Sequence, residues 1–292
     1  MYELIQVAPR SYYIDAPAKI GLVKTGENEV CLIDSGNDKD AAKKVRKILN
    51  ANGWHLSKIF NTHFHADHVG GNAYLQAQTG CEIYAPAIEV GLIQNPILEP
   101  ALLYGGCPPK ELRHKFLMAQ PSQVHPLTPA ALPDGWEMID LPGHSLGMVG
   151  YQTPDDVIFL ADSLASEQTL NKYGVTVLYD LPAYLQTLER ITSMSANLFI
   201  PSHAAPTDTI APLAQLNIEK TRNIIDFLLD LCRQPLTFEQ ILAQIFEHFA
   251  LSLTVEQHVL VGSTIRSYLA HLTVSARLTT TITNNQLLWH TL

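Results

Sequence analysis

The chain has 292 residues, with 28 acidic side chains against 19 basic ones and a formal net charge of -9. Hydrophobic residues make up 47% and charged residues 16%, a globular composition that excludes a disordered or fibrous chain. The length allows one large domain, or a large domain with a small one. The acidic balance argues against a general binder of nucleic acid, because such binding needs a basic surface.

The cysteines and the apolar segments indicate the compartment. The four cysteines stand far apart, so we expect buried reduced thiols and no disulfide scaffold. Residues 1–9 lack the basic and apolar regions of a signal peptide, and no apolar run is long enough to span a bilayer. These features predict a soluble cytoplasmic protein without a membrane segment.

Short strand-like and helix-like segments alternate along the first third of the chain. Residues 20–23 and 30–33 are apolar runs joined by Thr25-Gly26-Glu27-Asn28, which predicts a hairpin. Residues 38–50 place apolar side chains at helical spacing, which predicts a helix. A strand at 58–61, a helix at 70–78 and a strand at 81–84 complete a pattern that is typical of layered α/β packing.

A proline-rich segment, residues 86–127, interrupts this pattern and cannot form the interior of a sheet. We expect an excursion over the sheet edge, where it could form a pocket wall or a lid. Residues 1–233 are predicted to form the main domain. Its remaining strands are expected at 137–141, 149–153, 157–160 and 198–200, and its remaining helices at 184–191 and 213–231.

The last segment, residues 234–292, has a different character. Residues 238–249 and 255–272 predict two helices, the first capped by Thr237. Residues 276–291 alternate around Thr283-Asn284-Asn285-Gln286, which is a hairpin signal. Two helices followed by a hairpin predict a small winged-helix-like domain.

One string of residues concentrates metal-binding side chains. His63-Phe64-His65-Ala66-Asp67-His68 follows a predicted strand and opens a predicted helix. Residues two apart on an extended segment project to the same side, so His63 and His65 can share one metal. Asp67 and His68 follow where the chain turns into the helix, and they can face a neighbouring metal position. Imidazoles and a carboxylate at this density suit zinc, with iron or manganese as substitutes.

Three further candidates lie at the ends of later strands. His144 follows the strand at 137–141, Asp162 ends the run 157–162, and His203 closes the run 198–203. Ligands gather at the carboxyl ends of strands in α/β sheets, so these segments are expected to open onto one edge. Taken singly, each residue also fits a surface histidine or a capping aspartate.

Together these residues resemble the metallo-β-lactamase superfamily of hydrolases. The resemblance covers roughly the first 210 to 230 residues, in order, and includes Leu32-Ile33-Asp34-Ser35-Gly36 as a strand end. It implies an α/β (α+β) fold class, namely an αββα sandwich with a dinuclear metal site at one edge of its two sheets. By position, one metal would take His63, His65 and His144, the second would take Asp67, His68 and His203, and Asp162 would bridge the pair.

The ligand pattern also discriminates within the superfamily. A His at position 65 with a bridging Asp is similar to the glyoxalase II, lactonase and RNase Z hydrolases. Zinc β-lactamases of the commonest type carry Cys where Asp162 stands, and flavodiiron oxygen reductases usually carry Glu where His65 stands. β-Lactamase activity and oxygen reduction are therefore disfavoured. Mononuclear-iron persulfide dioxygenases share much of the motif and stay open as an alternative.

The resemblance implies hydrolysis of a small thioester, lactone or related ester by a metal-bridging hydroxide. Two cations roughly 3.5 to 4 Å apart lower the pKa of a bridging water and stabilise the developing oxyanion. Asp67 is the expected catalytic residue, and Asp34 the expected hydrogen-bond partner of an imidazole. Two Zn²⁺ are the expected cofactors, with Fe or Mn as alternatives. A phosphodiesterase or nuclease of the same fold and a non-catalytic metal-binding protein are the other candidate functions.

The remaining expectations concern the substrate and the partners. Lys172 and Tyr173 lie in a predicted loop from which some relatives contact substrate, a position that a solvated loop also explains. From residue 213 onward the chain has 5 basic and 6 acidic residues and no basic stripe, so nucleic acid is not an expected partner. We expect a small-molecule substrate, no membrane contact, and a tail that closes over the active-site edge or supports a homodimer.

Overall fold

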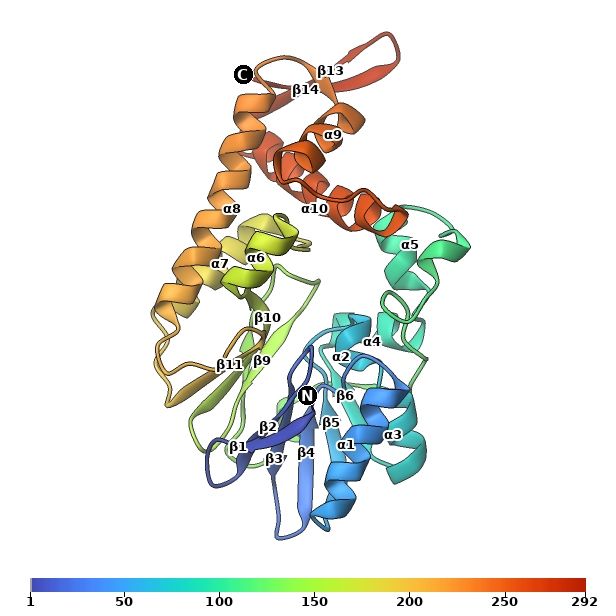
Figure 1. Ribbon diagram of the computed structural model, residues 1–292, viewed down its shortest axis with the longest axis vertical. Coiled ribbons are helices and arrows are strands. Elements are labelled where there is room, and N and C mark those ends of the chain that lie inside the picture. Colours follow the sequence, from blue (N-terminus) through green and yellow to red (C-terminus); the bar gives the residue numbers. More distant parts are fainter. Residues whose placement is uncertain (1) are drawn as a thin grey trace.

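The computed structural model describes residues 2–292 and shows two β-sheets packed face to face with helices on both outer faces (Figure 1). The helices α1 (Lys39–Ala51) and α3 (Asn72–Thr79) cover the larger sheet. The helices α7 (Leu181–Thr192) and α8 (Ala211–Leu231) cover the smaller one. This is the predicted αββα sandwich, so the fold class is confirmed.

The larger sheet holds its strands in chain order. They are β1 (Glu3–Gln6), β2 (Ser11–Asp15), β3 (Ile20–Lys24), β4 (Glu29–Ile33), β5 (His55–Phe60), β6 (Glu82–Ala85) and β7 (His125–Pro126). From β1 to β4 neighbours pair antiparallel, so the predicted hairpin between β3 and β4 is confirmed. From β4 to β7 they pair parallel, with α1 and α3 in the first two crossovers.

The smaller sheet carries the later candidate residues. Its strands β8 (Glu137–Asp140), β9 (Val149–Gln152) and β10 (Val157–Ala165) pair antiparallel, and β11 (Leu198–His203) pairs parallel to β10. The short helix α6 (Glu167–Tyr173) and α7 connect β10 to β11, and a 3-10 turn, η2 (Pro129–Ala131), precedes β8. The order β11-β10-β9-β8 places β10, which bears Asp162, inside the sheet.

Side chains of the central strands alternate between two buried layers because both faces of each sheet are covered. In β4, Val30 and Leu32 pack with α1, whereas Ile33 faces the other sheet. Aromatic rings fill the layer between the sheets, where the ring centroids of Phe60 and Tyr151 lie 5.9 Å apart. This packing holds the two sheets in fixed register at the edge where the candidate residues project.

The proline-rich segment, residues 86–127, contains short helices joined by irregular chain. These are α4 (Ala87–Gln94), α5 (Leu98–Tyr104) and the 3-10 turn η1 (Lys110–Leu112), after which β7 returns to the sheet edge. Both α5 and η1 contact α10 (Val255–Val274), the long helix of the tail (Figure 1). The segment is thus an excursion, as predicted, and it joins the sandwich to the tail.

The tail contains the predicted helices and hairpin. Thr237 caps α9 (Phe238–His248) in a reciprocal capping box with Gln240. Asn284 and Asn285 both have positive φ, as a two-residue hairpin turn requires, between β13 (Leu278–Thr283) and β14 (Gln286–Thr291). The strand β12 (Leu236–Thr237) completes this small sheet. The domain boundary and the winged-helix identity stay predictions, since one hydrophobic cluster continues from α7 and α8 into α9 and α10.

Several expectations need correction. The strands β1 and β2 were not predicted, because both segments are short and their polar ends obscure the alternation. The helix expected at 70–78 is α3, which begins two residues later, at Asn72. A separate short helix, α2 (Ala66–Val69), precedes it, and Gly70 and Gly71 lie between the two. All four cysteines are free, but Cys107 is exposed whereas the other three are buried. Across residues 2–292, every helix falls short of the length or the hydropathy that spanning a bilayer requires.

Gly70 marks a close backbone approach beside the candidate site. A Cβ added there would lie 2.0 Å from the Asn37 carbonyl oxygen. We therefore expect Gly70→Ala to lower the free energy of unfolding by about 2 to 3 kcal/mol, measured by urea denaturation. The control is Gly91→Ala in α4, where a Cβ meets open space and the helix should gain about 0.5 to 1 kcal/mol. Equal stability of the two variants would contradict the close approach.

Candidate metal centre

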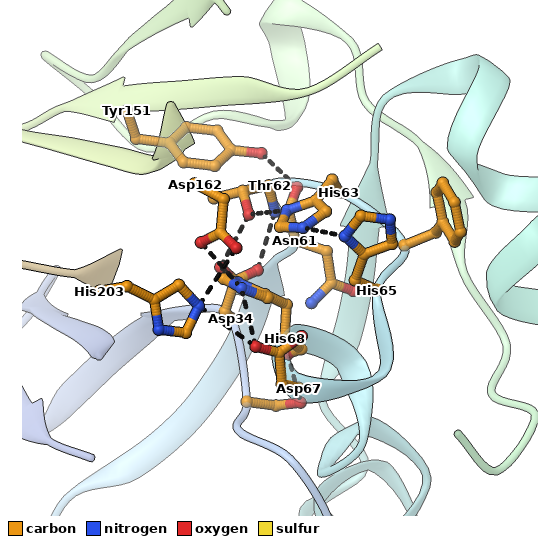
Figure 2. A network of polar contacts seen from close by, with 12 residues as sticks. Asp34, Asn61, Thr62, His63, His65, Asp67, His68, Tyr151, Asp162 and His203 are labelled. Atoms are coloured by element: carbon orange, nitrogen blue, oxygen red, sulfur yellow. Dashed lines mark hydrogen bonds and ion pairs between the residues drawn. The ribbon is translucent and has the colours of Figure 1, made fainter. Parts of the chain in front are cut away.

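The candidate residues come together in two groups where the two sheets meet. One group consists of His63, His65 and His144, and the other of Asp67, His68, Asp162 and His203. Within each group the atoms that could bind a cation lie within 4.8 Å of one another. Figure 2 shows His63 and His65 side by side, with Asp162, His68 and His203 turned toward one another.

The ends of strands place most of these side chains. The loop after β5 carries His63, and α2 begins directly behind it, so that Asp67 and His68 lie in the first turn of α2. His144 lies in the loop between β8 and β9, and His203 is the last residue of β11. Three elements of two sheets thus meet at one edge, as the sequence predicted.

Asp162 does not end its strand, contrary to expectation. The strand β10 continues to Ala165, and its pairing with β11 shifts register on both sides of Ala161, which has a φ of 49°. Such a bulge bends the strand and redirects the side chains beside it. It points the Asp162 carboxylate at both groups: Oδ1 lies 3.1 Å from His68 Nε2, and Oδ2 lies 3.6 Å from His144 Nε2.

Hydrogen bonds determine which ring nitrogens face the centre. His68 Nδ1 donates to Asp34 Oδ2 at 2.8 Å, because a carboxylate can only accept. The Thr62 hydroxyl also donates to Asp34 Oδ2, so it must accept from His63 Nδ1 at 3.0 Å. In the neutral rings, Nε2 of both histidines therefore carries a lone pair directed inward. Asp34 is the imidazole partner that the sequence suggested.

His144 and His203 follow the same rule, whereas His65 does not. His144 Nδ1 donates to the Val177 carbonyl at 2.9 Å, and His203 Nδ1 donates to the Pro17 carbonyl at 3.0 Å. His65 instead turns Nδ1 inward, 3.0 Å from Nε2 of both His63 and His144. A single proton on that nitrogen can satisfy only one of these contacts. The first group thus has more converging acceptors than its protons can satisfy.

The second group also fits a cation. His68 Nε2 and Asp162 Oδ1 are buried without a hydrogen-bond partner among the described residues. They face each other at 3.1 Å, but not in hydrogen-bonding geometry. Buried polar atoms are normally paired, so two buried atoms without a hydrogen-bond partner at one point fit a bound cation. Imidazole nitrogen and carboxylate oxygen are the donors that zinc, iron and manganese accept.

The protonation states of the three histidines in the first group suit this donor set. Burial lowers the pKa of His144 and His63 below the ordinary value and that of His65 to about 3, so these rings are neutral at neutral pH. Burial disfavours the Asp67 carboxylate, but without a cation the charge of His68 and the hydrogen bond from His203 together outweigh it and lower the Asp67 pKa to about 2. Without a cation, Asp162 raises the pKa of His203 to about 10. Protonated imidazole then supplies the positive charge that a metal would supply.

A buried carboxylate that the sequence analysis missed connects the two ligand loops. Glu89, in α4, is fully buried. It accepts hydrogen bonds from the Phe64 backbone N–H at 3.1 Å, the Ser145 hydroxyl at 2.8 Å and the Gly147 backbone N–H at 2.7 Å. One partner lies between His63 and His65, and another follows His144. A lone acid in the apolar run Ala87-Ile88-Glu89-Val90 was the available signal.

Glu89→Gln tests this connection. The amide keeps the size of the side chain, but its NH₂ must face one of the three donors. We expect a loss of about 1 to 3 kcal/mol of folding stability and a 10- to 100-fold weaker zinc affinity, by the usual magnitudes for a buried unpaired donor and for support of metal ligands. Thermal unfolding and competition with a zinc chelator measure the two effects. An unchanged zinc affinity would show that the loops hold their positions without Glu89.

The two candidate substrate residues lie in a helix, contrary to the expected loop. Lys172 and Tyr173 form the last turn of α6, and Lys172 Nζ donates to the Tyr173 hydroxyl at 3.1 Å. Both line an open groove that also reaches Asp67 and His203. The loop prediction failed because Ser166 caps a short helix that has little hydrophobic periodicity.

Comparisons with known proteins identify the family of this chain. A family model described as "Metallo-beta-lactamase superfamily" matches residues 15–203. A hydroxyacylglutathione hydrolase of Methylococcus capsulatus is 34% identical over 128 residues, which cover 44% of this chain and 41% of that protein. The chain therefore spans less than half the length of this curated relative.

Two solved structures share the whole fold. A beta-lactamase domain protein from Burkholderia ambifaria matches with a TM-score of 0.74 at 17% identity, over 99% of this chain and 94% of that one. A metallo-beta-lactamase family protein from Thermus thermophilus also matches with a TM-score of 0.74, at 18% identity, over 97% and 99% of the two chains. At these identities the likeness shows the fold alone. The matched residues include the tail, because they cover 97% or more of this chain.

The family match extends over more than half of the chain and contains every member of the two groups. A superfamily site of this His and Asp composition implies a metal cofactor. The chain belongs to the metallo-β-lactamase superfamily.

Proposed function

We propose that this protein is a metal-dependent hydrolase that cleaves a small thioester, with lactones and related esters as further substrates. The observation that carries the proposal is the convergence of inward-facing imidazole nitrogens and carboxylate oxygens in two adjacent groups. Relatives named hydroxyacylglutathione hydrolase support the choice of a thioester among the possible esters.

The two groups would each hold one cation. His63, His65 and His144 would hold the first, and Asp67, His68 and His203 the second, with Asp162 reaching both. Zinc suits these donors best, and iron or manganese would also be accepted. When bound, such cations polarise a carbonyl oxygen and lower the pKa of a water molecule. The hydrogen bonds of Asp34, Val177 and Pro17 keep the imidazoles turned toward the centre.

Asp67 is the carboxylate that a substrate can reach. Its side chain is 36% exposed, compared with 10% for Asp162, and its Oδ2 lies 3.3 Å from His203 Nε2. It also faces the open groove. In hydrolysis, water adds an oxygen to the acyl carbon, the bond to sulfur breaks, and a proton goes to the thiol. In this proposal Asp67 orients that water and carries the proton to the leaving sulfur.

A substrate panel tests the proposal. The protein loaded with zinc, and separately with iron and manganese, would be assayed with an acyl thioester, a lactone and bis-p-nitrophenyl phosphate. We expect release of thiol to be the fastest reaction. Turnover of the phosphodiester alone would instead assign a phosphodiesterase or nuclease, and no turnover by metal-loaded protein would favour a non-catalytic metal-binding role. The iron-loaded protein with a persulfide and oxygen tests the dioxygenase alternative.

A further inference from the structure

An apolar cavity of about 220 Å³ adjoins the metal centre, and Asp67 is not among the residues that line it. His144, Asp162 and His203 line one end of it. From there it extends between β10, α6 and α7 on one side and α10 of the tail on the other. A group bound in this cavity would therefore touch the reacting centre directly.

The walls of this cavity carry few polar groups. They are formed mainly by Leu164, Val175, Tyr184, Leu260 and Val261. Among the described residues that line it, Asp162 and the two histidines are the only ionisable side chains besides tyrosines. A charged or strongly polar group would lose its hydration here without gaining a partner, whereas a hydrocarbon group gains from leaving water.

The open groove on the other side of the centre differs in character. It measures about 770 Å³ and is lined by Asp67, Lys44, Lys115 and Lys172 among other polar side chains. Thr169, Tyr173 and His203 line both spaces, so the centre lies where an apolar pocket meets a polar groove. This asymmetry favours a substrate with a hydrocarbon part on one side of the scissile bond and a polar part on the other.

We propose that the apolar cavity is the acyl-binding pocket of this enzyme and that it selects a hydrocarbon acyl group, with the thiol leaving through the polar groove. The inference rests on the proposed hydrolase function. An apolar cavity of about 150 Å³ holds a benzene molecule, so this one fits an acyl group of roughly six to nine carbon atoms. An acyl group bearing a hydroxyl or a charge at the end away from the carbonyl is a poorer fit.

The proposal makes α10 of the tail a specificity element. Gln257, Leu260 and Val261 line the cavity from this helix. Two hydrogen bonds fix α10 to the sandwich: Leu178 N–H donates to Thr264 Oγ1 at 3.2 Å, and the Ser267 hydroxyl donates to the Tyr179 carbonyl at 2.8 Å. The pocket wall is therefore held in place before substrate binds.

Binding of straight-chain carboxylates, which are the products of such a reaction, tests the pocket without requiring turnover. Calorimetry on zinc-loaded protein would compare acetate through decanoate. We expect affinity to rise about fourfold for each added methylene, as burial of a methylene predicts, and to level off at roughly eight carbons. Affinity that stays flat from acetate to decanoate would overturn the proposal.

Substitutions at Leu260 test whether this cavity causes the dependence of affinity on chain length. Leu260→Trp fills the cavity and should move the plateau to shorter chains, whereas Leu260→Ala enlarges it and should move the plateau to longer ones. The control is Leu253→Ala, which removes a side chain that is 67% exposed just before α10 and should leave the series unchanged. If neither Leu260 variant changes the chain length at which affinity levels off, the hydrocarbon binds outside this cavity and the proposal is wrong. Chain-length dependence without thioester hydrolysis would contradict the proposed function and leave the pocket supported.

Discussion

Asp162→Ala is expected to lower kcat/KM for the hydrolysed substrate by about 10³-fold or more. The Asp162 carboxylate lies 3.1 Å from His68 Nε2 and 3.2 Å from His203 Nε2, and it reaches His144 at 3.6 Å. Its removal takes the shared oxygen donor from both groups. Bound cations supply several kcal/mol of charge stabilisation in hydrolases of this kind, and each 1.4 kcal/mol corresponds to about tenfold in rate. Steady-state kinetics and metal analysis of the same preparation measure the loss.

The control for this variant is Asp134→Ala. Asp134 is a carboxylate in the turn before β8, away from both groups, and its substitution changes the net charge by the same amount. We expect it to retain the activity and metal content of the unmodified chain. An Asp162→Ala protein that hydrolyses the substrate within tenfold of that chain would show that the bulge in β10 does not serve the reaction.

Asp34→Ala is expected to have the largest effect on stability, a loss of about 3 to 5 kcal/mol in the free energy of unfolding. Its buried carboxylate accepts from the Thr62 backbone N–H, the Thr62 hydroxyl and His68 Nδ1, each at 2.8 Å. Breaking a buried pair of this kind leaves donors unpaired and typically costs that much. Alanine also tolerates the positive φ of 62° at this position poorly. Chemical denaturation of the metal-free protein measures the change.

Asp34→Asn separates the loss of the carboxylate hydrogen bonds from the strain of positive φ. Asparagine accepts positive φ and keeps one acceptor oxygen, but its NH₂ cannot accept from His68 or from the Thr62 hydroxyl. It should therefore lose less stability than Asp34→Ala while weakening zinc binding about 10- to 100-fold. If Asp34→Asn bound zinc as tightly as the unmodified chain, the hydrogen bond to His68 would not be what orients that ring.

The parts of the fold that the sequence predicted are those set by local pattern. The helix α1 follows from apolar spacing after the Asp38 cap, and the terminal hairpin follows from Asn284 and Asn285, which tolerate positive φ. The string from His63 to His68 predicted members of both groups of metal-binding residues, because the side-chain directions of an extended segment and a helix turn are set locally. The same segment needed no tertiary information to be recognised.

What the sequence could not predict depends on contacts between distant residues. The bulge at Ala161 arises from pairing with β11, and the helical state of Lys172 and Tyr173 depends on a short capped turn. Glu89 acquires its role only when α4 packs beside both ligand loops. The apolar pocket requires α10 to lie against α6 and α7, which are far from it in the sequence. None of these contacts has a periodic signature.

Metal analysis of the purified chain tests the central claim most directly. The protein would be incubated with zinc, freed of unbound metal by gel filtration and analysed by inductively coupled plasma mass spectrometry. The two groups of converging ligands predict about two zinc ions per chain. A folded protein that retains no zinc, iron or manganese under these conditions would contradict the account.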